Sequence, residues 1–528
     1  MGIIKRKQDR FCGILLHPSS LPGNSGIGDI GKQAYKFVDF LHESEQSLWQ
    51  ILPLGITGYG NSPYQSYSAF AGNHLLISLD WLYQEGLLTP FELESFPRGN
   101  PSKVDFDLVN REKLHLLKES LKRFKEKASV ELKERYQVFK KKNRKWLQDY
   151  SLFMAILEAN DYRLWNTWPE ELVHREKEAL SKARNEYASQ IEFHKLAQFV
   201  FYHQWNLLKR YANDKGIKII GDIPIFVALN SADVWANPEK FYLDDKGNPT
   251  VVAGVPPDYF SKTGQLWGNP LYNWKKMKKA HYSWWINRIR AMLELVDIIR
   301  IDHFRGFAAY WEVPAGEKTA MNGRWVKGPG HDFFAALQRK LGHEGQKLPL
   351  IAEDLGVITE DVEELRDDFH LPGMKILQFA FGGRAQNAYL PHNHIENCFV
   401  YTGTHDNNTT LGWYQKAAEK EKDHVRRYFN CSDDRAPLEI MRAAWGSNAR
   451  WAVVPLQDVI GLDSSGRMNV PGTAKGNWQW RFQWDLIKQS HIAMLKYHAD
   501  LYGRTSYEVE EKFADGKTPD PRKAVEPD

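Results

Sequence analysis

Eight short apolar runs, spread along the chain and separated by helix-like sequence, constrain the fold more than any other feature. Each run is aliphatic or β-branched and ends in a polar or glycine-rich turn, as buried strands do. The runs are Gly13–His17, Leu48–Leu54, Ile217–Ile223, Val296–Asp302, Leu350–Glu353, Met374–Phe381, Cys398–Thr404 and Trp451–Leu456. Apolar strands that alternate with amphipathic helices form parallel sheets, and eight such units close into a barrel. The sequence therefore predicts an α/β fold, a (β/α)₈ TIM barrel.

Two long insertions interrupt the predicted barrel. The stretch after the second strand is too long for one helix and repeats Leu, Phe and Tyr at helical spacing, so a large helical insertion is expected there. The stretch after the third strand is loop-rich and aromatic, and we expect it to lie over the barrel mouth. The predicted segments are 1–55 for strands one and two, 56–216 for the helical subdomain, 217–227 for strand three, 228–280 for the loop-rich insertion, 281–503 for strands four to eight and 504–528 for a charged, mobile tail.

Composition narrows the classes of partner. The chain has 70 Lys and Arg residues against 66 Asp and Glu, so its formal charge of +4 gives no strong field for nucleic acid or an anionic membrane. No signal peptide and no stretch approaching 18 apolar residues occurs. The three cysteines, Cys12, Cys398 and Cys431, show no disulfide or metal-ligand spacing. We therefore expect a cytoplasmic protein, monomeric or homodimeric, with a neutral substrate.

Polar residues with catalytic chemistry stand at the carboxyl ends of these runs. The residues at or just beyond those ends are His17, Asp222, Asp302, Glu353, His405 and Asp406. In a TIM barrel these ends share one face, where active sites form. A single carboxylate at a strand end is often only a helix cap or an ion-pair partner. Three carboxylates at the ends of strands four, five and seven together predict a catalytic site.

The fourth run carries the strongest chemical signal. Residues two apart on a strand share a face, so Arg300 and Asp302 point the same way. A cation beside a carboxylate lowers its pKa, and we expect this to keep Asp302 ionised. An ionised, oriented carboxylate is what a glycosidase nucleophile must be. Glu353, at the end of the neighbouring barrel strand, is the candidate general acid/base. His405 and Asp406, at the end of the seventh strand, are candidates to bind sugar hydroxyls.

Two other kinds of site, for a dinucleotide and for a metal ion, are not supported by the surrounding sequence. Residues Gly26–Gly31 match the dinucleotide fingerprint G-x-G-x-x-G, but the first strand ends near His17, several residues earlier. The second strand closes with Leu54–Gly55 rather than with the acidic residue that binds a ribose. The 18 histidines form no H-E-x-x-H motif, and no Asp/Asn-rich loop has the spacing of a calcium cage. We expect no nucleotide, no metal and no cofactor.

Longer motifs give the chain a family resemblance. They are Gly13-Ile-Leu-Leu-His-Pro-Ser-Ser-Leu-Pro, Ser62-Pro-Tyr-Gln-Ser-Tyr-Ser-Ala-Phe-Ala-Gly-Asn, Gly221-Asp-Ile-Pro-Ile-Phe-Val, Gly254-Val-Pro-Pro-Asp-Tyr-Phe-Ser, Gln265-Leu-Trp-Gly-Asn-Pro-Leu-Tyr and Pro471-Gly-Thr-Ala-Lys-Gly-Asn-Trp. With the three carboxylate segments they cover nearly the whole chain. The carboxylates resemble those of the α-amylase clan. Within that clan the chain resembles the 4-α-glucanotransferases called amylomaltases or disproportionating enzymes.

The resemblance implies roles for the matching residues. It implies Asp302 as nucleophile, Glu353 as acid/base and Asp406 as transition-state stabiliser. Four residues would form the subsite of the transferred sugar, which stacks on the first of them: Tyr64, Asp222, Arg300 and His405. Four more would contact neighbouring glucose units: Asp258, Trp267, Phe379 and Asn477. Tyr59 resembles a residue of an outer glucan-binding groove, although a Tyr beside Gly60 also serves to pack a loop.

The activity that the resemblance implies is transfer of α-1,4-glucan segments to the 4-hydroxyl of glucose or a maltooligosaccharide. The implied mechanism is a retaining double displacement between carboxyl groups about 5 to 5.5 Å apart. A retaining α-glucan hydrolase with the same carboxylates stays open. A catalytically silent glycan-binding barrel is a third alternative, against which the carboxylates speak. Aromatic residues make up 13% of the chain, including 19 Trp, which suits either sugar-stacking surfaces or a larger core.

Overall fold

The centre of the computed structural model is a parallel eight-stranded sheet in the order β10-β11-β12-β1-β2-β3-β6-β9. The structure describes residues 9–257, 261–342 and 347–505. The strands of this sheet are β1 Phe11–Leu15, β2 Leu48–Gln50, β3 Lys218–Pro224, β6 Ile298–Asp302, β9 Leu350–Ala352, β10 Gly373–Ile376, β11 Cys398–Tyr401 and β12 Trp451–Pro455. The Ala352 N–H donates to the Pro372 carbonyl at 2.9 Å, which joins β9 to the residue before β10. The predicted eight-stranded barrel is confirmed.

Strand lengths differ from the prediction at the barrel rim. The second run was expected to reach Leu54, but β2 ends at Gln50, and β10 gives way to the 3-10 turn Leu377–Phe379. Apolar residues continue past these points because the chain stays buried while it turns out of the ladder. Close strand contact needs a glycine in β1, since a Cβ on Gly13 would lie 2.1 Å from the Leu48 carbonyl oxygen.

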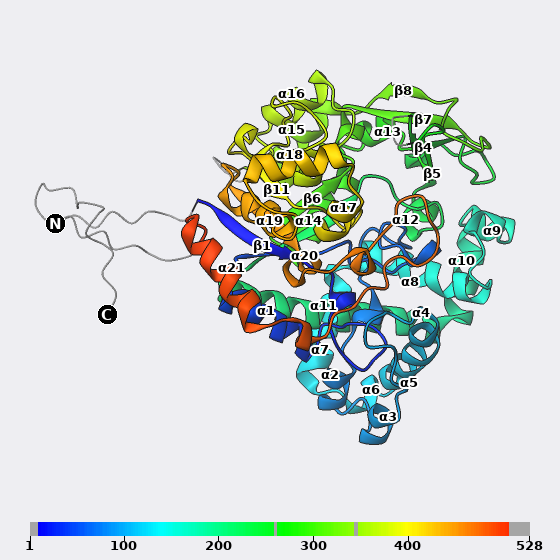
Figure 1. The fold of residues 1–528 in the computed structure, drawn as a ribbon. Helices are drawn as coiled ribbons and strands as arrows, with labels where there is room; N and C mark the ends of the chain where they lie inside the picture. The colour runs from blue at the N-terminus through cyan, green and yellow to red at the C-terminus, as the bar shows by residue number, and fades with distance from the viewer. Residues whose placement is uncertain (1–8, 258–260, 343–346, 506–528) are drawn as a thin grey trace, which may run out of the picture.

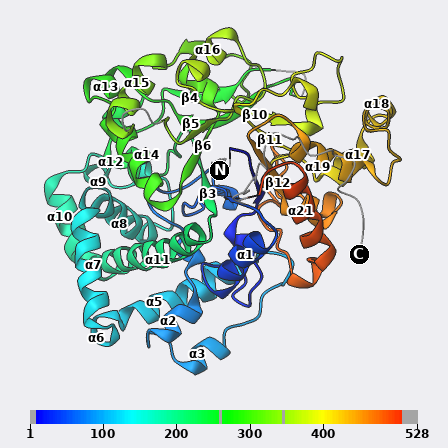
Figure 2. The same ribbon diagram turned by 90° about the vertical axis from the view of Figure 1, so that its left-hand side faces the viewer.

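Helices cover the outside of the barrel, as the two ribbon views show (Figures 1 and 2). Those that follow barrel strands are α1 Lys32–Glu43, α11 Ala188–Asp214, α14 Ser283–Leu295, α15 Gly330–Leu341, α16 Glu360–Asp368, α17 Thr410–Lys416, α18 Glu419–Phe429, α19 Ala436–Gly446, α20 Leu456–Ile460 and α21 Gln489–Leu501. Helix α11 is fixed to α14 where the Trp205 indole N–H donates to the Leu295 carbonyl at 2.7 Å. This layer buries the outer face of the sheet.

One outer helix is missing. Helix-like sequence was expected between all neighbouring strands, but residues 377–397 contain only the 3-10 turns Leu377–Phe379 and Pro391–Asn393. Gly382, Gly383 and Pro391 weaken helix formation there, because glycine carries extra backbone entropy and proline lacks the N–H. The expectation of a helix at this point is wrong.

The long connection between β2 and β3 is mainly helical. Before α11 it contains α2 Leu79–Gln84, α3 Pro90–Glu94, α4 Phe106–Leu108, α5 Leu114–Lys122, α6 Phe124–Lys127, α7 Val130–Lys142, α8 Arg144–Ala159, α9 Glu170–Val173 and α10 Lys177–Glu186. Local sequence starts these helices: Thr89 and Glu92 form a capping box at α3, and Ser129 caps α7. The helices lie together on one side of the barrel (Figure 2).

A second, antiparallel sheet was not predicted. Its strands are β5 Gln265–Pro270, β4 Val251–Val255, β7 Ala309–Pro314 and β8 Arg324–Lys327, in that order across the sheet. The segment 228–280, expected to be loop-rich, thus supplies β4 and β5 as well as α12 Ala232–Ala236 and α13 Trp274–Lys279. The sheet joins this segment to the connection after β6, through pairs such as Gly254 with Trp311. The paired strands are far apart in the sequence, so no local sequence pattern predicts this sheet.

Two arginines close the barrel at the amino ends of its strands. The Arg504 side chain is fully buried and donates to the carbonyl oxygens of Phe11 at 2.9 Å, Trp445 at 2.8 Å and Ala449 at 2.9 Å. Arg10 donates to the Tyr502 carbonyl at 2.9 Å. These contacts tie the start of β1 to the segment before β12 and to the end of α21.

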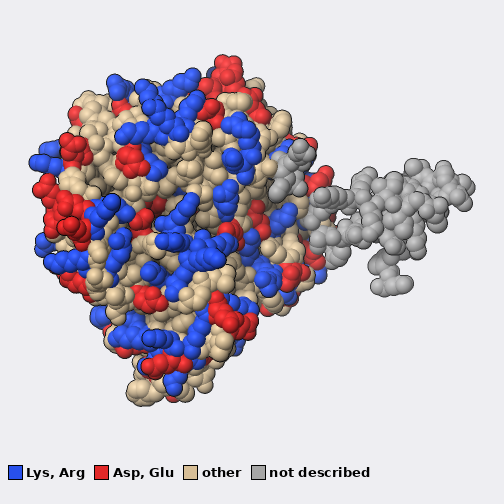
Figure 3. Space-filling view, turned by 180° about the vertical axis from the view of Figure 1, so that it is seen from behind, with Lys and Arg blue, Asp and Glu red and all other residues tan. Residues whose placement is uncertain are grey.

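The surface carries both signs of charge. Figure 3 shows Lys and Arg side chains interleaved with Asp and Glu over the face seen from behind. Among the helices that the structure describes, none combines the length and the apolar character needed to cross a membrane.

Candidate active site

A buried ion-pair network forms where β3 and β6 end. The register of these neighbouring strands sets Asp222 opposite Arg300, so both side chains enter the barrel at the same level. The Arg300 guanidinium donates from Nη1 to Asp222 Oδ2 at 2.7 Å and to Asp302 Oδ1 at 3.0 Å. Asp222 and Arg300 are almost completely buried, while the Asp302 side chain stays 29% exposed. The network holds Asp302 with part of its surface open.

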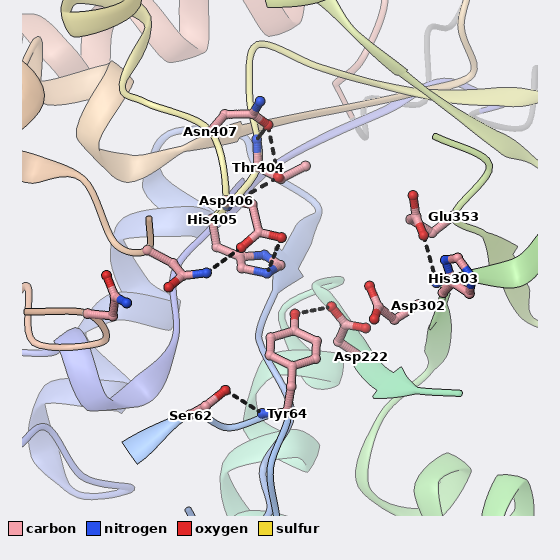
Figure 4. Close-up of polar contacts among 12 residues, drawn as sticks. Ser62, Tyr64, Asp222, Asp302, His303, Glu353, Thr404, His405, Asp406 and Asn407 are labelled. Carbon is pink, nitrogen blue, oxygen red and sulfur yellow. Dashed lines mark hydrogen bonds and ion pairs between the residues drawn. The ribbon is translucent and has the colours of Figure 1, made fainter. Parts of the chain in front are cut away.

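Tyr64 brings the loop after β2 into this network. Its hydroxyl donates to Asp222 Oδ2 at 2.8 Å (Figure 4). Its ring stacks on the His405 imidazole, with centroids 5.1 Å apart and planes 17° apart. The Trp478 ring packs against both, at 5.9 Å from Tyr64 and 5.8 Å from His405. Residues from distant parts of the sequence thus build one wall.

Glu353 follows β9 and is held by backbone N–H groups. The His303 N–H donates to Glu353 Oε2 at 2.6 Å, and the Leu355 N–H donates to Oε1 at 3.1 Å. His303 adopts φ 54°, a left-handed conformation that non-glycine residues rarely take. This strained residue directly follows Asp302, so the local turn after β6 positions the carboxylate after β9 (Figure 4).

Asp406 is held by residues that sequence reasoning missed. The Asn469 side-chain amide donates to Asp406 Oδ1 at 2.6 Å, and the Arg467 guanidinium donates to the Asp406 carbonyl at 2.6 Å. The Asn469 N–H donates to the His405 carbonyl at 3.1 Å, and His405 Nε2 lies 3.3 Å from Asp406 Oδ2. Arg467 and Asn469 follow β12 by more than ten residues, and no motif of their own marks them.

The environment separates the pKa values of the carboxylates. Burial raises the pKa of Asp302 to about 6 although Arg300 opposes the rise, and burial together with the charge of Asp302 raises that of Glu353 to about 8. Burial also acts on Asp406, but His405 and Asn469 outweigh it and hold that pKa below its usual range. Arg300 lowers the pKa of Asp302 as expected, but the expected net lowering is wrong, because burial and the charges of Asp222 and Asp406 outweigh Arg300. The environment therefore favours the protonated form of Glu353 more strongly than that of Asp302, which Arg300 helps to keep ionised.

Comparison with known proteins identifies the family. A family model described as 4-alpha-glucanotransferase matches residues 16–487. The chain is 48% identical over 506 residues to the 4-alpha-glucanotransferase of Synechocystis sp., covering 95% of this chain and 100% of that protein. It is 50% identical over 503 residues to that of Thermus thermophilus, covering 94% and 99%. The chain belongs to the 4-alpha-glucanotransferase family.

A solved structure supports the same assignment. The amylomaltase from Streptococcus agalactiae in complex with acarbose matches with a TM-score of 0.90 and 39% sequence identity, over 94% of this chain and all of that one. The family resemblance inferred from the motifs is therefore confirmed. Membership of the 4-alpha-glucanotransferase family disfavours both the hydrolase and the silent binding barrel.

The outer residues implied by the 4-alpha-glucanotransferase resemblance lie in different environments. Trp267 packs edge-on against His303 with centroids 4.7 Å apart, and the His303 N–H donates to Glu353. Phe379 is 41% exposed and packs edge-on against Tyr389. Asn477 is buried and uses its side chain within its own loop, accepting from the Val470 N–H at 3.0 Å and donating to the Thr473 carbonyl at 2.8 Å.

The structure does not describe two of the predicted site residues in full. Asp258 and the side chain of Tyr59 are not among the described parts of this 4-alpha-glucanotransferase. Over residues 9–257, 261–342 and 347–505, no group of three or more His, Cys, Asp or Glu side chains is arranged to hold a metal ion. The expectation that the enzyme needs no metal or cofactor stays a prediction.

Proposed function

We propose that this 4-alpha-glucanotransferase moves α-1,4-glucan segments to the 4-hydroxyl of glucose or another α-glucan by a double displacement with retention. The observation that carries the residue roles is the placement of two carboxyl groups at one rim, with Asp302 paired to Arg300 and Glu353 held by two backbone N–H groups. A protonated Glu353 suits a general acid, and a largely ionised Asp302 suits a nucleophile.

In the first step Glu353 gives its proton to the glycosidic oxygen while Asp302 attacks the anomeric carbon. The C–O bond to the leaving chain breaks, and a glycosyl ester forms on Asp302. The leaving chain departs with the proton as a free 4-hydroxyl. Asp406, ionised and held by Asn469, stabilises the positive charge that develops on the sugar.

In the second step the acceptor hydroxyl takes the place of the leaving group. Glu353, now deprotonated, removes the hydroxyl proton, and the oxygen attacks the anomeric carbon of the glycosyl ester. The bond to Asp302 breaks and the carboxylate is restored. Two inversions give net retention, and the separation of about 5 to 5.5 Å between the carboxyl groups stays a prediction.

The remaining predicted residues take binding roles in this proposal. The stacked rings of Tyr64 and His405 lie beside the transferred sugar. Asp222 accepts from the Tyr64 hydroxyl and so holds that ring. Arg300 donates to Asp222 and to the nucleophile Asp302. Outer glucose units are assigned to Asp258, Trp267, Phe379 and Asn477, and Tyr59 is assigned to an outer groove. Because the Asn477 amide is occupied by its own loop, we assign it a role in shaping that loop as well as in binding.

The setting of the enzyme completes the proposal. We propose cytoplasmic localisation, α-1,4-glucan donors with glucose or maltooligosaccharide acceptors, and a monomer or homodimer. Residues 56–216 are proposed as a helical subdomain. Of the proposed tail 504–528, residues 506–528 lie outside the described residues.

One assay tests the reaction. The enzyme is incubated with maltotriose, and the products are separated by chain length while new reducing ends are counted. Transfer gives glucose together with longer maltooligosaccharides and no net gain of reducing ends. A steady rise in reducing ends without longer products would replace the proposal with hydrolysis.

A further inference from the structure

One aromatic side chain near the site faces solvent. Trp325 lies on β8 and is 42% exposed, which makes it the most exposed of the 19 Trp residues. An exposed indole leaves a large apolar surface in water, and such surfaces mark binding sites when they are held in place. None of the catalytic contacts described above uses this ring.

The ring is fixed on two sides. The Arg305 guanidinium lies over it, with Cζ 3.9 Å from the ring centroid. Trp311, its cross-strand partner, packs edge-on with centroids 5.2 Å apart and planes 71° apart. Trp311 is itself anchored where its indole N–H donates to the Ala320 carbonyl at 2.8 Å. A ring that is already immobile loses little conformational entropy when a ligand stacks on it.

The same contacts place the ring beside both catalytic loops. Arg305 comes three residues after Asp302, and its guanidinium donates to the carbonyl of Val357, four residues after Glu353. The general acid protonates the oxygen of the departing chain and later activates the acceptor, so the loop of Glu353 belongs to the acceptor side. Val357, whose carbonyl accepts from Arg305, is 61% exposed.

We propose that Trp325 is a stacking platform for a glucose unit of the acceptor chain, several units away from the bond that is formed. The inference rests on the proposed function, because it takes Glu353 as the acid/base. The indole offers a flat apolar surface to the C–H face of a glucose ring, as exposed aromatic side chains do for planar partners. A long acceptor reaches this ring, whereas glucose does not.

The experiment compares acceptors of two lengths with one activated α-glucosyl fluoride donor. Trp325→Ala should lower the ratio of kcat/KM for maltohexaose to that for glucose by about tenfold, mainly through KM. Trp325→Phe keeps a flat ring and should restore most of the ratio. Tyr497→Ala on α21 removes another exposed aromatic, 62% exposed, and serves as the matched control.

The outcomes are distinguishable. A ratio that stays at the wild-type value in Trp325→Ala overturns the platform, and so does an equal fall for both acceptors with a lower melting temperature, which makes Trp325 structural. Absence of any transfer to glucose by the wild-type enzyme would instead overturn the proposed function, whatever Trp325 does.

Discussion

The two ends of the barrel treat buried charge in opposite ways. At the carboxyl ends, Asp302, Glu353 and Asp406 share one rim, and Asp222 Oδ1 is buried without a hydrogen-bond partner among the described residues. At the amino ends, Arg504 is surrounded by carbonyl oxygens that accept from its guanidinium. The first arrangement leaves a buried carboxylate oxygen unpaired within the described part of the chain, and the second gives each nitrogen of the Arg504 guanidinium a carbonyl acceptor. We therefore expect substitutions at one end to change the reaction and at the other to change the stability.

The sharpest test uses the two ends of a single strand. Asp302→Asn should lower transfer by at least about 10⁴-fold, because an amide cannot form the glycosyl ester. The melting temperature should change little, because Arg300 stays paired with Asp222. Transfer rates and thermal unfolding measure both effects.

The control for this variant lies at the amino end of β6. Asp297 accepts from the Ile219 N–H at 2.8 Å and lies 3.3 Å from Lys209, so Asp297→Asn should lower the melting temperature and leave transfer intact. Disproportionation that survives in Asp302→Asn would break the comparison.

The acid/base comes next in size. Glu353→Gln should lose about 10² to 10⁴-fold in rate on natural glucans, because the glutamine cannot supply a proton. The loss should be much smaller with a glucosyl fluoride, whose departure needs no proton. Steady-state rates on both donors decide the matter, and equal losses would remove Glu353 from the acid role.

At the amino ends the expected effect is on folding. Arg504→Ala leaves several buried carbonyl groups without a donor and should lower the free energy of unfolding by about 3 kcal/mol. Activity per folded molecule should stay within about twofold. Urea unfolding and specific activity are measured on the same preparation. A variant that keeps its stability but loses activity would show that the two ends are not separate.

The pH profile tests the carboxyl end without substitution. Asp302, with its pKa raised to about 6, must be ionised, so kcat/KM falls as the pH drops below that value. Glu353, with its pKa raised to about 8, must be protonated, so kcat/KM falls as the pH rises above it. The fall approaches about tenfold per pH unit on either side. An alkaline limb that persists in Glu353→Gln with the fluoride donor would assign it to another group.

The smallest effect concerns the support of Asp406. Asn469→Ala removes a hydrogen bond to an ionised carboxylate and should lower kcat by about tenfold with little change in KM for the donor. Asn469→Asp replaces the donor with a like charge, which raises the pKa of Asp406 and should lower kcat further. Unchanged kcat in both variants would reduce Asn469 to a loop contact.

Sequence patterns predicted the strands and the residues at their ends, but they missed contacts between segments that are distant in the sequence. The eight runs and the carboxylates at their ends follow from periodicity and from strand neighbours, and the register of Asp222 with Arg300 confirms that logic. The antiparallel sheet and the Asn469 contact depend on segments about 60 residues apart, which no window of the sequence contains. The pKa of Asp302 depends on burial, which Arg300 two residues away does not reveal.

The contacts of Arg10 and Arg504 beside β1 and β12 bear on the order in which the elements follow one another along the chain. Arg10 and Arg504 bring the start of β1 and the end of α21 together, so a short peptide could join them with little rearrangement. A new start at Gly316, in the exposed turn between β7 and β8, would leave every barrel strand whole. Such a circular permutant would keep the same neighbours around the barrel while changing the order of synthesis. We expect the permutant to keep its activity, because catalysis depends on which strands are neighbours in the barrel and not on their order along the chain.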